Sequence, residues 1–200
     1  MPVVPQPAGR RERNKQEKLE RITQAASELF ARYGVDEVTT QQIAEAADIG
    51  TGTLFLYART KGELLLLVQN IHYAQALERG VQAAAATTKT LDGLMALLEP
   101  IVECNRVHTE NGRTYLREMV FGDPSEPRHG EALEIVAQTQ QAMTGLLCER
   151  EKLDERAAAT LAQVVSSIMF LSMAASANAP AAVGEILQGI RAQVEAILPG

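Results

Sequence analysis

The stretch VTTQQIAEAADIGTGTLFLYARTK, residues 38–61, decides the fold of this chain. Thr39 and Gln42 fit a capping box, in which the N-cap hydroxyl and a Gln three residues later each bind the other's backbone N–H group. A helix is therefore expected to begin here, with Ile43 and Ala44 facing inward. Together with a second short helix, it would form a unit small enough to enter the major groove of DNA.

The turn between the two short helices is expected at Asp48-Ile49-Gly50. Such a turn often needs a positive φ, which Asp and Gly adopt more readily than bulky residues. The second helix is expected over about residues 51–57, with Leu54 buried. Gly52 in its first turn costs about 1 kcal/mol relative to Ala. This glycine suits a helix that approaches a base edge or a phosphate closely; the alternative is that it only marks a frayed helix start.

This stretch resembles the DNA-binding region of the TetR family of bacterial transcription regulators. The family pattern has Thr-Thr, then Ile-Ala in the first helix, then Gly-Thr-Leu and an aromatic residue in the second. Here these are residues 39–40, 43–44 and 52–55, followed by Tyr57 and Lys61. The match covers about the first quarter of the chain, and its strength lies in several elements in the right order. The resemblance implies a DNA-binding transcriptional regulator, most often a repressor, that binds a palindromic operator as a homodimer and is released by a small-molecule effector.

The resemblance also implies which residues contact DNA. Phosphate contacts are expected from Thr40, Thr53, Tyr57 and Lys61, and base-edge contacts from Gln41, Gln42, Thr51 and Phe55, with Gly52 allowing close approach. The sequence departs from the family pattern at Gly50, where a Ser often caps the second helix. Thr51 stands where a basic residue often follows, so one cap and one phosphate contact are missing from the family pattern, unless Thr51 itself takes over the capping. Phe55 stands where the family frequently has Tyr.

The composition predicts an all-α protein. The 200 residues are 46% hydrophobic and 22% charged, with four Phe, four Tyr and no Trp, while Ala and Leu abound. The net charge of −6 is uneven: residues 1–61 carry nine Lys or Arg against eight Asp or Glu, and residues 62–200 carry ten against seventeen. An acidic body with a basic leading edge would bind a polyanion in one orientation. The alternative is that the basic residues near the start only form a solvated helix face.

Three parts are predicted: a flexible basic arm at 1–14, a helix-turn-helix DNA-binding domain at 15–60, and a helical effector-binding and dimerisation domain at 61–200. In the first part, Arg10, Arg11 and Arg13 inherit from the family a possible role at the minor groove or nearby phosphates. About nine helices are expected in all. Beyond the two short ones they are a first helix from about residues 11–15 to 33, then 61–80, 90–108, 113–121, 129–150, 155–178 and 181–198.

Two of these helices carry features of their own. Thr60 and Glu63 predict a second capping box, which would place Lys61 where its ammonium and the helix amides share one phosphate. Pro100 is expected to kink or split the helix at 90–108.

The last two helices each carry an apolar stripe. The stripes consist of Leu161, Val164, Val165, Ile168, Leu171 and Ala175, and of Val183, Ile186, Leu187, Ile190, Val194 and Ile197. Two copies of such a helix pair would close a four-helix bundle across a two-fold axis, as the TetR family does. A homodimer through the last two helices is therefore expected. The alternative is that both stripes pack inside a monomer.

The effector-binding residues are less evident from the sequence. Polar and sulfur-containing side chains of the middle helices are the candidates: Glu103, Arg106, His108, Tyr115, Met119, Met143 and Met169. Met at helical spacing is also typical of plain core. Cys104 and His108 lie four residues apart beside Glu103, but so few ligands do not predict a metal site. No metal and no cofactor are expected.

Other classes of protein are less consistent with the sequence. No nucleophile is paired with a base and the three histidines share no motif, so an enzyme is not expected. An all-helical module that binds ligands or partners without DNA remains the alternative. Cys104 and Cys148 do not form a disulfide framework, and neither a signal sequence nor a membrane span is evident. A cytoplasmic protein without membrane contact is expected.

Overall fold

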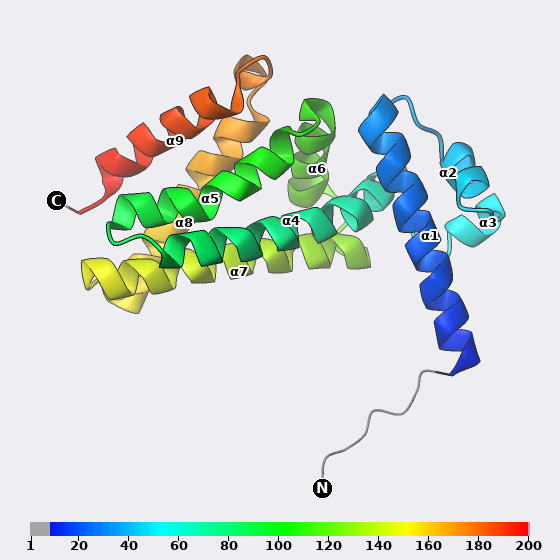
Figure 1. Cartoon of the computed structure of the whole chain (residues 1–200), viewed down its shortest axis with the longest axis horizontal. Coiled ribbons are helices and arrows are strands. Elements are labelled where there is room, and N and C mark those ends of the chain that lie inside the picture. Colours follow the sequence, from blue (N-terminus) through cyan, green and yellow to red (C-terminus); the bar gives the residue numbers. More distant parts are fainter. Residues whose placement is uncertain (1–8, 200) are drawn as a thin grey trace, which may run out of the picture.

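The computed structural model of the chain describes residues 9–199, except for the side chain of Glu12. All regular structure in this range is helical, which confirms the predicted fold class (Figure 1). The α-helices are α1 Arg10–Tyr33, α2 Thr40–Ala46, α3 Thr51–Leu54, α4 Lys61–Ala85, α5 Thr90–Arg106, α6 Thr109–Phe121, α7 Pro127–Glu151, α8 Glu155–Ala174 and α9 Val183–Ile197. A short 3₁₀ helix, Ser176–Asn178, follows α8.

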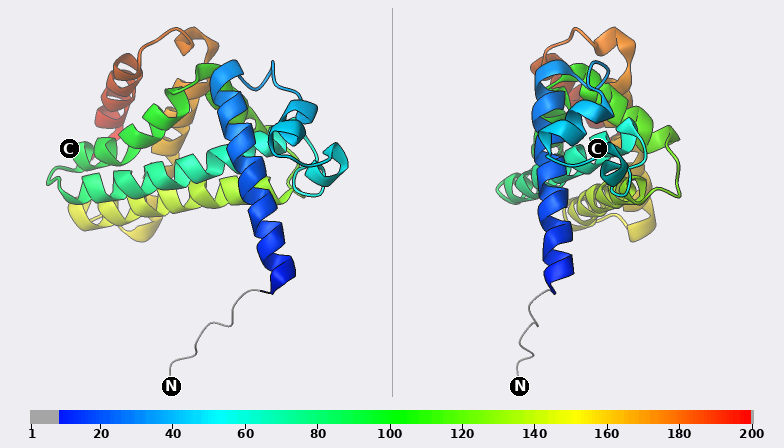
Figure 2. Two further views of the ribbon diagram at one scale, coloured as in Figure 1. Left: turned by 45° about the vertical axis from the view of Figure 1, so that its right-hand side comes forward. Right: turned by 90° about the vertical axis from the view of Figure 1, so that its right-hand side faces the viewer.

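Helices α1 to α3 form a small head at one end of the molecule (Figures 1 and 2). Ile22 and Phe30 of α1, Ile43 of α2 and Leu54 of α3 are all buried in its core. The first half of α1 projects away from the rest of the molecule (Figure 1). The head therefore presents α2, α3 and the start of α1 on its outer side.

The structure corrects the predicted arm at residues 1–14. Helix α1 begins at Arg10, so residues 10–14 are its first turns. Arg, Glu and Lys have high helix propensity, which explains why the helix extends this far without a side-chain cap at Gly9. The rest of the predicted arm, residues 1–8, lies outside the described residues.

Helix α4 runs from the head along the whole body and packs against α5 and α7 (Figure 1). The sequence placed its end near Gly80, but it continues to Ala85, because the Ala-rich residues that follow are good helix formers. Gly80 is buried at the crossing with α5, where an added Cβ would overlap the backbone oxygen of Leu97. This glycine therefore serves close helix packing and does not stop the helix.

The body consists of α5 to α9 around α4. Pro100 lies inside α5, which is not split, although Pro removes one backbone hydrogen bond. Helix α6 begins at Thr109, four residues earlier than expected, because His108 caps it through Nδ1, which accepts from the N–H of Asn111 at 3.4 Å. Cys104 and Cys148 are free thiols, as predicted.

Candidate nucleic-acid interface and internal cavity

The start of α2 has the predicted capping box. The Thr39 N–H donates to Gln42 Oε1 at 2.8 Å, and the Gln42 N–H donates to Thr39 Oγ1 at 3.2 Å. Gln41 lies on the same exposed face and donates from Nε2 to Glu45 Oε1 at 2.9 Å. The oxygen of the Gln42 side chain is thus used inside the protein, while its amide N–H groups remain available for a partner.

The turn after α2 has the predicted positive φ, and Asp48 supplies it with φ 53°. Gly50 instead has φ −73° and an extended backbone. Arg21 of α1 lies 3.4 Å from Asp48 Oδ2. The Asp48 side chain is almost fully exposed, so this ion pair adds little to stability.

Helix α3 differs from the prediction at both ends. Its N-cap is Gly50 and no side chain caps it, so the cap that the family often has is missing and Thr51 does not replace it. The helix ends at Leu54 rather than at Tyr57, and residues 55–57 form a turn. The chain turns here because Leu54 and Ala58 are both anchored in the core, while Thr60 must be extended as the N-cap of α4.

The outer face of α3 is open. A Cβ added at Gly50 or Gly52 would meet no atom within 4 Å. Phe55 and Leu56 expose 44% and 83% of their surface beside it. Packing within the chain does not require glycine at these two positions, so the free space faces outward.

Two of the residues expected to bind phosphates have partners within the chain. Lys61 Nζ donates to the backbone oxygen of Asp36 at 3.0 Å, and the Tyr57 hydroxyl donates to that of Lys15 at 3.4 Å. Lys61 lies at the start of α4, where only half of the predicted second capping box forms. The Glu63 N–H donates to Thr60 Oγ1 at 3.0 Å, as predicted. The Glu63 carboxylate, however, accepts from the N–H of Arg59 at 2.9 Å, one residue before Thr60, and not from the N–H of Thr60. Thr40, Thr51 and Thr53 are partly exposed.

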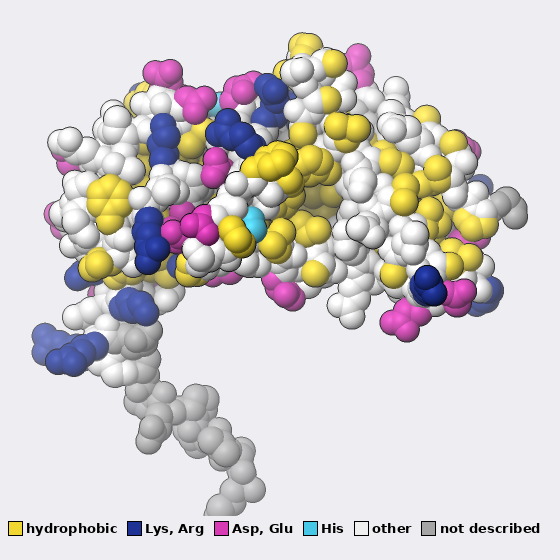
Figure 3. Space-filling view, turned by 180° about the vertical axis from the view of Figure 1, so that it is seen from behind, with side chains coloured by type: hydrophobic (Ala, Val, Ile, Leu, Met, Phe, Trp, Pro, Cys, Tyr) yellow, Lys and Arg dark blue, Asp and Glu magenta, His cyan; other side chains and the backbone are white. Residues whose placement is uncertain are grey.

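The body contains a cavity of about 450 Å³ between α4, α5, α6, α7 and α8. A hollow rich in hydrophobic side chains is visible on the face opposite that of Figure 1 (Figure 3). The cavity is lined by Tyr73, Ile101, Tyr115, Leu116, Met119, Val120, His129, Leu133, Ile135, Val136, Thr139, Gln140, Ser166, Ser167, Met169, Phe170 and Met173. Its size and mostly apolar wall are typical of small-molecule sites.

Three of the predicted effector-binding residues, Tyr115, Met119 and Met169, line this cavity. The structure places the other four elsewhere. Met143 is fully buried in the core, and Glu103 and His108 border a separate groove between α1, α4 and α5. The sequence placed all seven on middle helices, but residues of one helix can face different sides.

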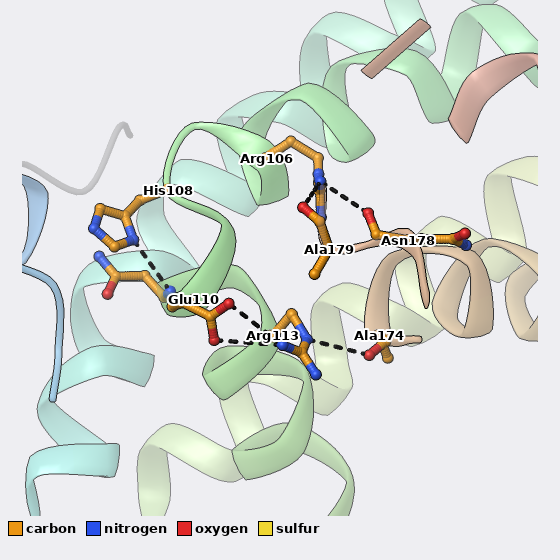
Figure 4. Close-up of polar contacts among 8 residues, drawn as sticks. Arg106, His108, Glu110, Arg113, Ala174, Asn178 and Ala179 are labelled. Atoms are coloured by element: carbon orange, nitrogen blue, oxygen red, sulfur yellow. Dashed lines mark hydrogen bonds and ion pairs between the residues drawn. The ribbon is translucent and has the colours of Figure 1, made fainter. Parts of the chain in front are cut away.

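Arg106 is the fourth of these residues, and its guanidinium has a structural role (Figure 4). Its Nη2 donates to the backbone oxygens of Asn178, Ala179 and Ala181 at 3.1, 2.8 and 2.9 Å. Arg113 donates to the oxygen of Ala174 nearby at 3.4 Å. These two arginines hold the connection between α8 and α9 against the body.

The sequence did not single out Tyr73 and His129 as cavity residues. The Tyr73 and Tyr115 rings stack with centroids 4.3 Å apart. Asn105 Nδ2 donates to the Tyr73 hydroxyl at 2.6 Å, and the Tyr115 hydroxyl donates to Asn70 Oδ1 at 3.0 Å. Burial, the largest cause, raises the pKa of both phenols. Neutral tyrosines thus form one wall of the cavity. In the sequence, the only signal for this wall would have been Asn70 and Asn105, the amide residues that bind the two hydroxyls.

The head contacts the body away from α4 as well. Asn111 at the start of α6 donates from Nδ2 to the oxygen of Phe30 at 2.8 Å and accepts at Oδ1 from the N–H of Val35 at 2.7 Å. Arg59, between α3 and α4, lies 3.4 Å from Glu126, just before α7. The Asn111 contacts fix the end of α1, so α6 joins the head to the cavity wall.

Comparison with known proteins assigns the head. Residues 22–68, from α1 into α4, match the sequence profile of the bacterial regulatory proteins of the tetR family. The head is therefore that of a TetR-family regulator. This match supports a DNA-binding transcription regulator with a helix-turn-helix head, as predicted. Helices α2 and α3 are the two helices of this motif.

Solved structures of other regulators share the fold over about nine-tenths of this chain. FadR from Thermus thermophilus, a transcriptional repressor solved in complex with lauroyl-CoA, is 24% identical with a TM-score of 0.70 over 91% of this chain and 96% of that one. A TetR/AcrR regulator from Thermobifida fusca is 16% identical with a TM-score of 0.66, over 92% of this chain and 100% of the other. FadR from Bacillus halodurans is 14% identical with a TM-score of 0.62, over 90% of this chain and 99% of the other. No curated protein is similar enough in sequence to count as a relative.

Proposed function

We propose that this TetR-family protein is a dimeric repressor that binds a palindromic operator and is released by a small apolar effector. The observation that carries the proposal is the course of α4, which begins at the head with Lys61 and lines the cavity with Tyr73. One helix therefore connects the surface that would bind DNA with the space that would bind an effector.

The DNA surface would be the exposed side of α2 and α3. Its proposed contacts remain Thr40, Gln41, Gln42, Thr51, Gly52, Thr53, Phe55, Tyr57 and Lys61, since each of them lies on these helices, in the turn to α4 or at the first residue of α4. The boundary between the DNA-binding and effector-binding domains is proposed at residues 60 and 61, where α4 begins.

The dimer surface would be formed mainly by α8. Leu171 and Val164 expose 66% and 42% of their surface, and Leu161 and Ile168 lie at the same three- and four-residue spacing. The other face of α8 and the α9 residues Ile186, Ile190 and Val194 pack within the protomer, so the predicted stripes are only partly free.

By length and composition alone, helix α8 is also long and apolar enough to cross a membrane. One third of its most apolar segment is buried inside the protein. A second copy packing on its outer face would bury such a helix without a membrane, since two-fold contacts are the commonest oligomers.

Two heads about 34–36 Å apart would enter successive major grooves on one side of DNA. An effector in the cavity would displace α4 and α6, which carry the head, and change the separation of the heads. The effector and the operator would then favour different head separations, which is negative coupling between two sites. The relative that holds lauroyl-CoA and the apolar wall here favour a chain-like apolar effector.

The test is a mobility shift of the purified protein on the DNA that flanks its own gene, titrated against salt. We expect a saturable complex with one dimer per site that weakens steeply with salt and is released by lauroyl-CoA or a related compound. Absence of binding at low salt would favour the helical module that binds ligands or partners without DNA.

The dimer is tested separately with Leu171→Glu. A carboxylate at this exposed position costs the protomer little but cannot be buried unpaired between two copies. Sedimentation equilibrium should show a dimer for the parent protein and a monomer for the variant. A variant that remains dimeric would exclude the outer face of α8 from the interface.

A further inference from the structure

His129 has an unusual position in the cavity wall. It lies in the first turn of α7, exposes only 6% of its surface and lines the cavity. Its Nε2 atom is buried and has no hydrogen-bond partner within the described part of the chain. Buried polar groups in proteins are almost always hydrogen-bonded, so we expect this atom to bind a partner from outside the chain.

The buried hydroxyls of the wall have partners within the chain. The Tyr115 hydroxyl donates to Asn70 at 3.0 Å, and the Thr139 hydroxyl donates to the oxygen of Ile135 at 2.8 Å. The exposed Ser167 hydroxyl donates to the oxygen of Gln163 at 2.9 Å. Most of the remaining wall is aliphatic, aromatic or Met side chains. A ligand that fits this wall is apolar over most of its length and polar at the end near His129.

The residues beside His129 connect it to the head. The backbone oxygen of Arg128 accepts from Asn70 Nδ2 of α4 at 2.9 Å. Glu126 lies 3.4 Å from Arg59, which precedes α4. The first turn of α7 therefore contacts the cavity on one side and the junction of head and body on the other.

We propose that His129 Nε2–H donates a hydrogen bond to a carboxylate or carbonyl oxygen at the end of a chain-like apolar effector, and that this bond fixes the first turn of α7 against Arg59 and Asn70. An imidazole donates from Nε2 in its cationic form and in one neutral tautomer. The proposal rests on the effector cavity proposed above. It adds the chemistry of the effector's polar end and the residue that selects it.

The test compares two probes with the same apolar tail, dodecanoate and dodecylammonium, below their micelle concentrations, by calorimetry on the full chain. Dodecanoate should bind more tightly, because only its head group accepts a hydrogen bond. His129→Phe should weaken dodecanoate about tenfold to a hundredfold, the range for a hydrogen bond to a charged group. His129→Gln, which keeps a donor, should recover part of this loss. His72→Phe, the same change at an exposed histidine outside the cavity, should bind dodecanoate like the parent protein.

A second readout measures coupling. Dodecanoate should lower the operator affinity of the parent protein and of His72→Phe, and should lose this effect in His129→Phe. Equal affinity for the two probes, or unchanged dodecanoate binding by His129→Phe, would overturn the role of His129 and leave the regulator proposal standing. Failure of both probes to bind the parent protein would overturn both the proposed role of His129 and the cavity as an effector site. Operator binding, measured on the same preparation, tests the regulator proposal independently.

Discussion

The head and the body of this protein use glycine for opposite purposes. Gly80 in the body is buried at a helix crossing, and a Cβ there would overlap the backbone of Leu97. Gly52 in the head is exposed, and a Cβ there would meet nothing within 4 Å. The first glycine is required by a contact that the chain makes with itself. The second has no such reason within the chain, which is the pattern expected where a surface is kept open for a partner.

The same contrast extends to polar side chains. In the body, Asn105 and Asn70 bind the two stacked tyrosines, and Arg106 binds backbone oxygens. In the head, the Gln42 amide and the Thr53 hydroxyl have no such buried partner. The body thus binds most of its buried polar groups internally, with His129 Nε2 among the exceptions, while the head leaves several for the solvent or for DNA.

The largest effect is expected from Gly80→Ala. The added methyl group must separate α4 from α5, and overpacking of this kind costs about 1–3 kcal/mol or more, against a gain of at most about 1 kcal/mol in helix propensity. Urea unfolding should show a lower free energy of unfolding for the variant. Equal or higher stability would show that the close crossing at Gly80 tolerates a side chain.

Gly52→Ala should have the reverse profile. The free energy of unfolding should stay the same or rise slightly, because Ala is the better helix former and the space is open. Operator affinity should fall about tenfold, equivalent to about 1.4 kcal/mol, if the methyl group meets DNA. Gly130→Ala is a matched control, since it also has open space but lies in α7 of the body. If both variants bind the operator like the parent protein, Gly52 does not approach DNA.

Thr39→Ala tests the capping box that starts the motif. Loss of the N-cap hydroxyl should lower the free energy of unfolding by about 1 kcal/mol. Operator affinity, measured at a temperature where the variant is still fully folded, should change less, because Thr39 is not among the proposed contacts. A loss of operator affinity without any loss of stability would instead move Thr39 into the interface.

The smallest effect is expected from Lys61→Ala. Its ammonium is held by the Asp36 oxygen at 3.0 Å, so it is ordered before DNA arrives. If it neutralises one phosphate, the slope of log affinity against log salt should become shallower by about 0.9, with similar losses on specific and non-specific DNA. An unchanged slope would limit Lys61 to its bond within the head.

Local signals made the head easy to predict. The capping box at Thr39 and the positive φ at Asp48 depend on residues close in sequence, and both were expected from sequence alone. The short α3 was not, because its end depends on where Leu54 and Ala58 enter the core. Contacts between distant segments decide such boundaries.

The cavity was less predictable for the same reason. Tyr115, Met119 and Met169 were expected there, but Glu103, Arg106, His108 and Met143 face other surroundings. Which side of a helix faces a cavity depends on how the helices cross, and apolar periodicity does not distinguish core from cavity wall. His129 carried no motif, and its significance depends on the burial of a single atom.

The two bonds of Asn111 limit how the head can move. The head is tied firmly to the body by the chain entering α4 and, at a separate place, by Asn111 holding the end of α1, while the ion pair of the exposed Arg59 with Glu126 is a third, weaker contact. An object held firmly at two points rotates most freely about the line that joins them. With both ties intact, the head would swing about this axis rather than slide, and α6, which carries one of the two points, would set its direction.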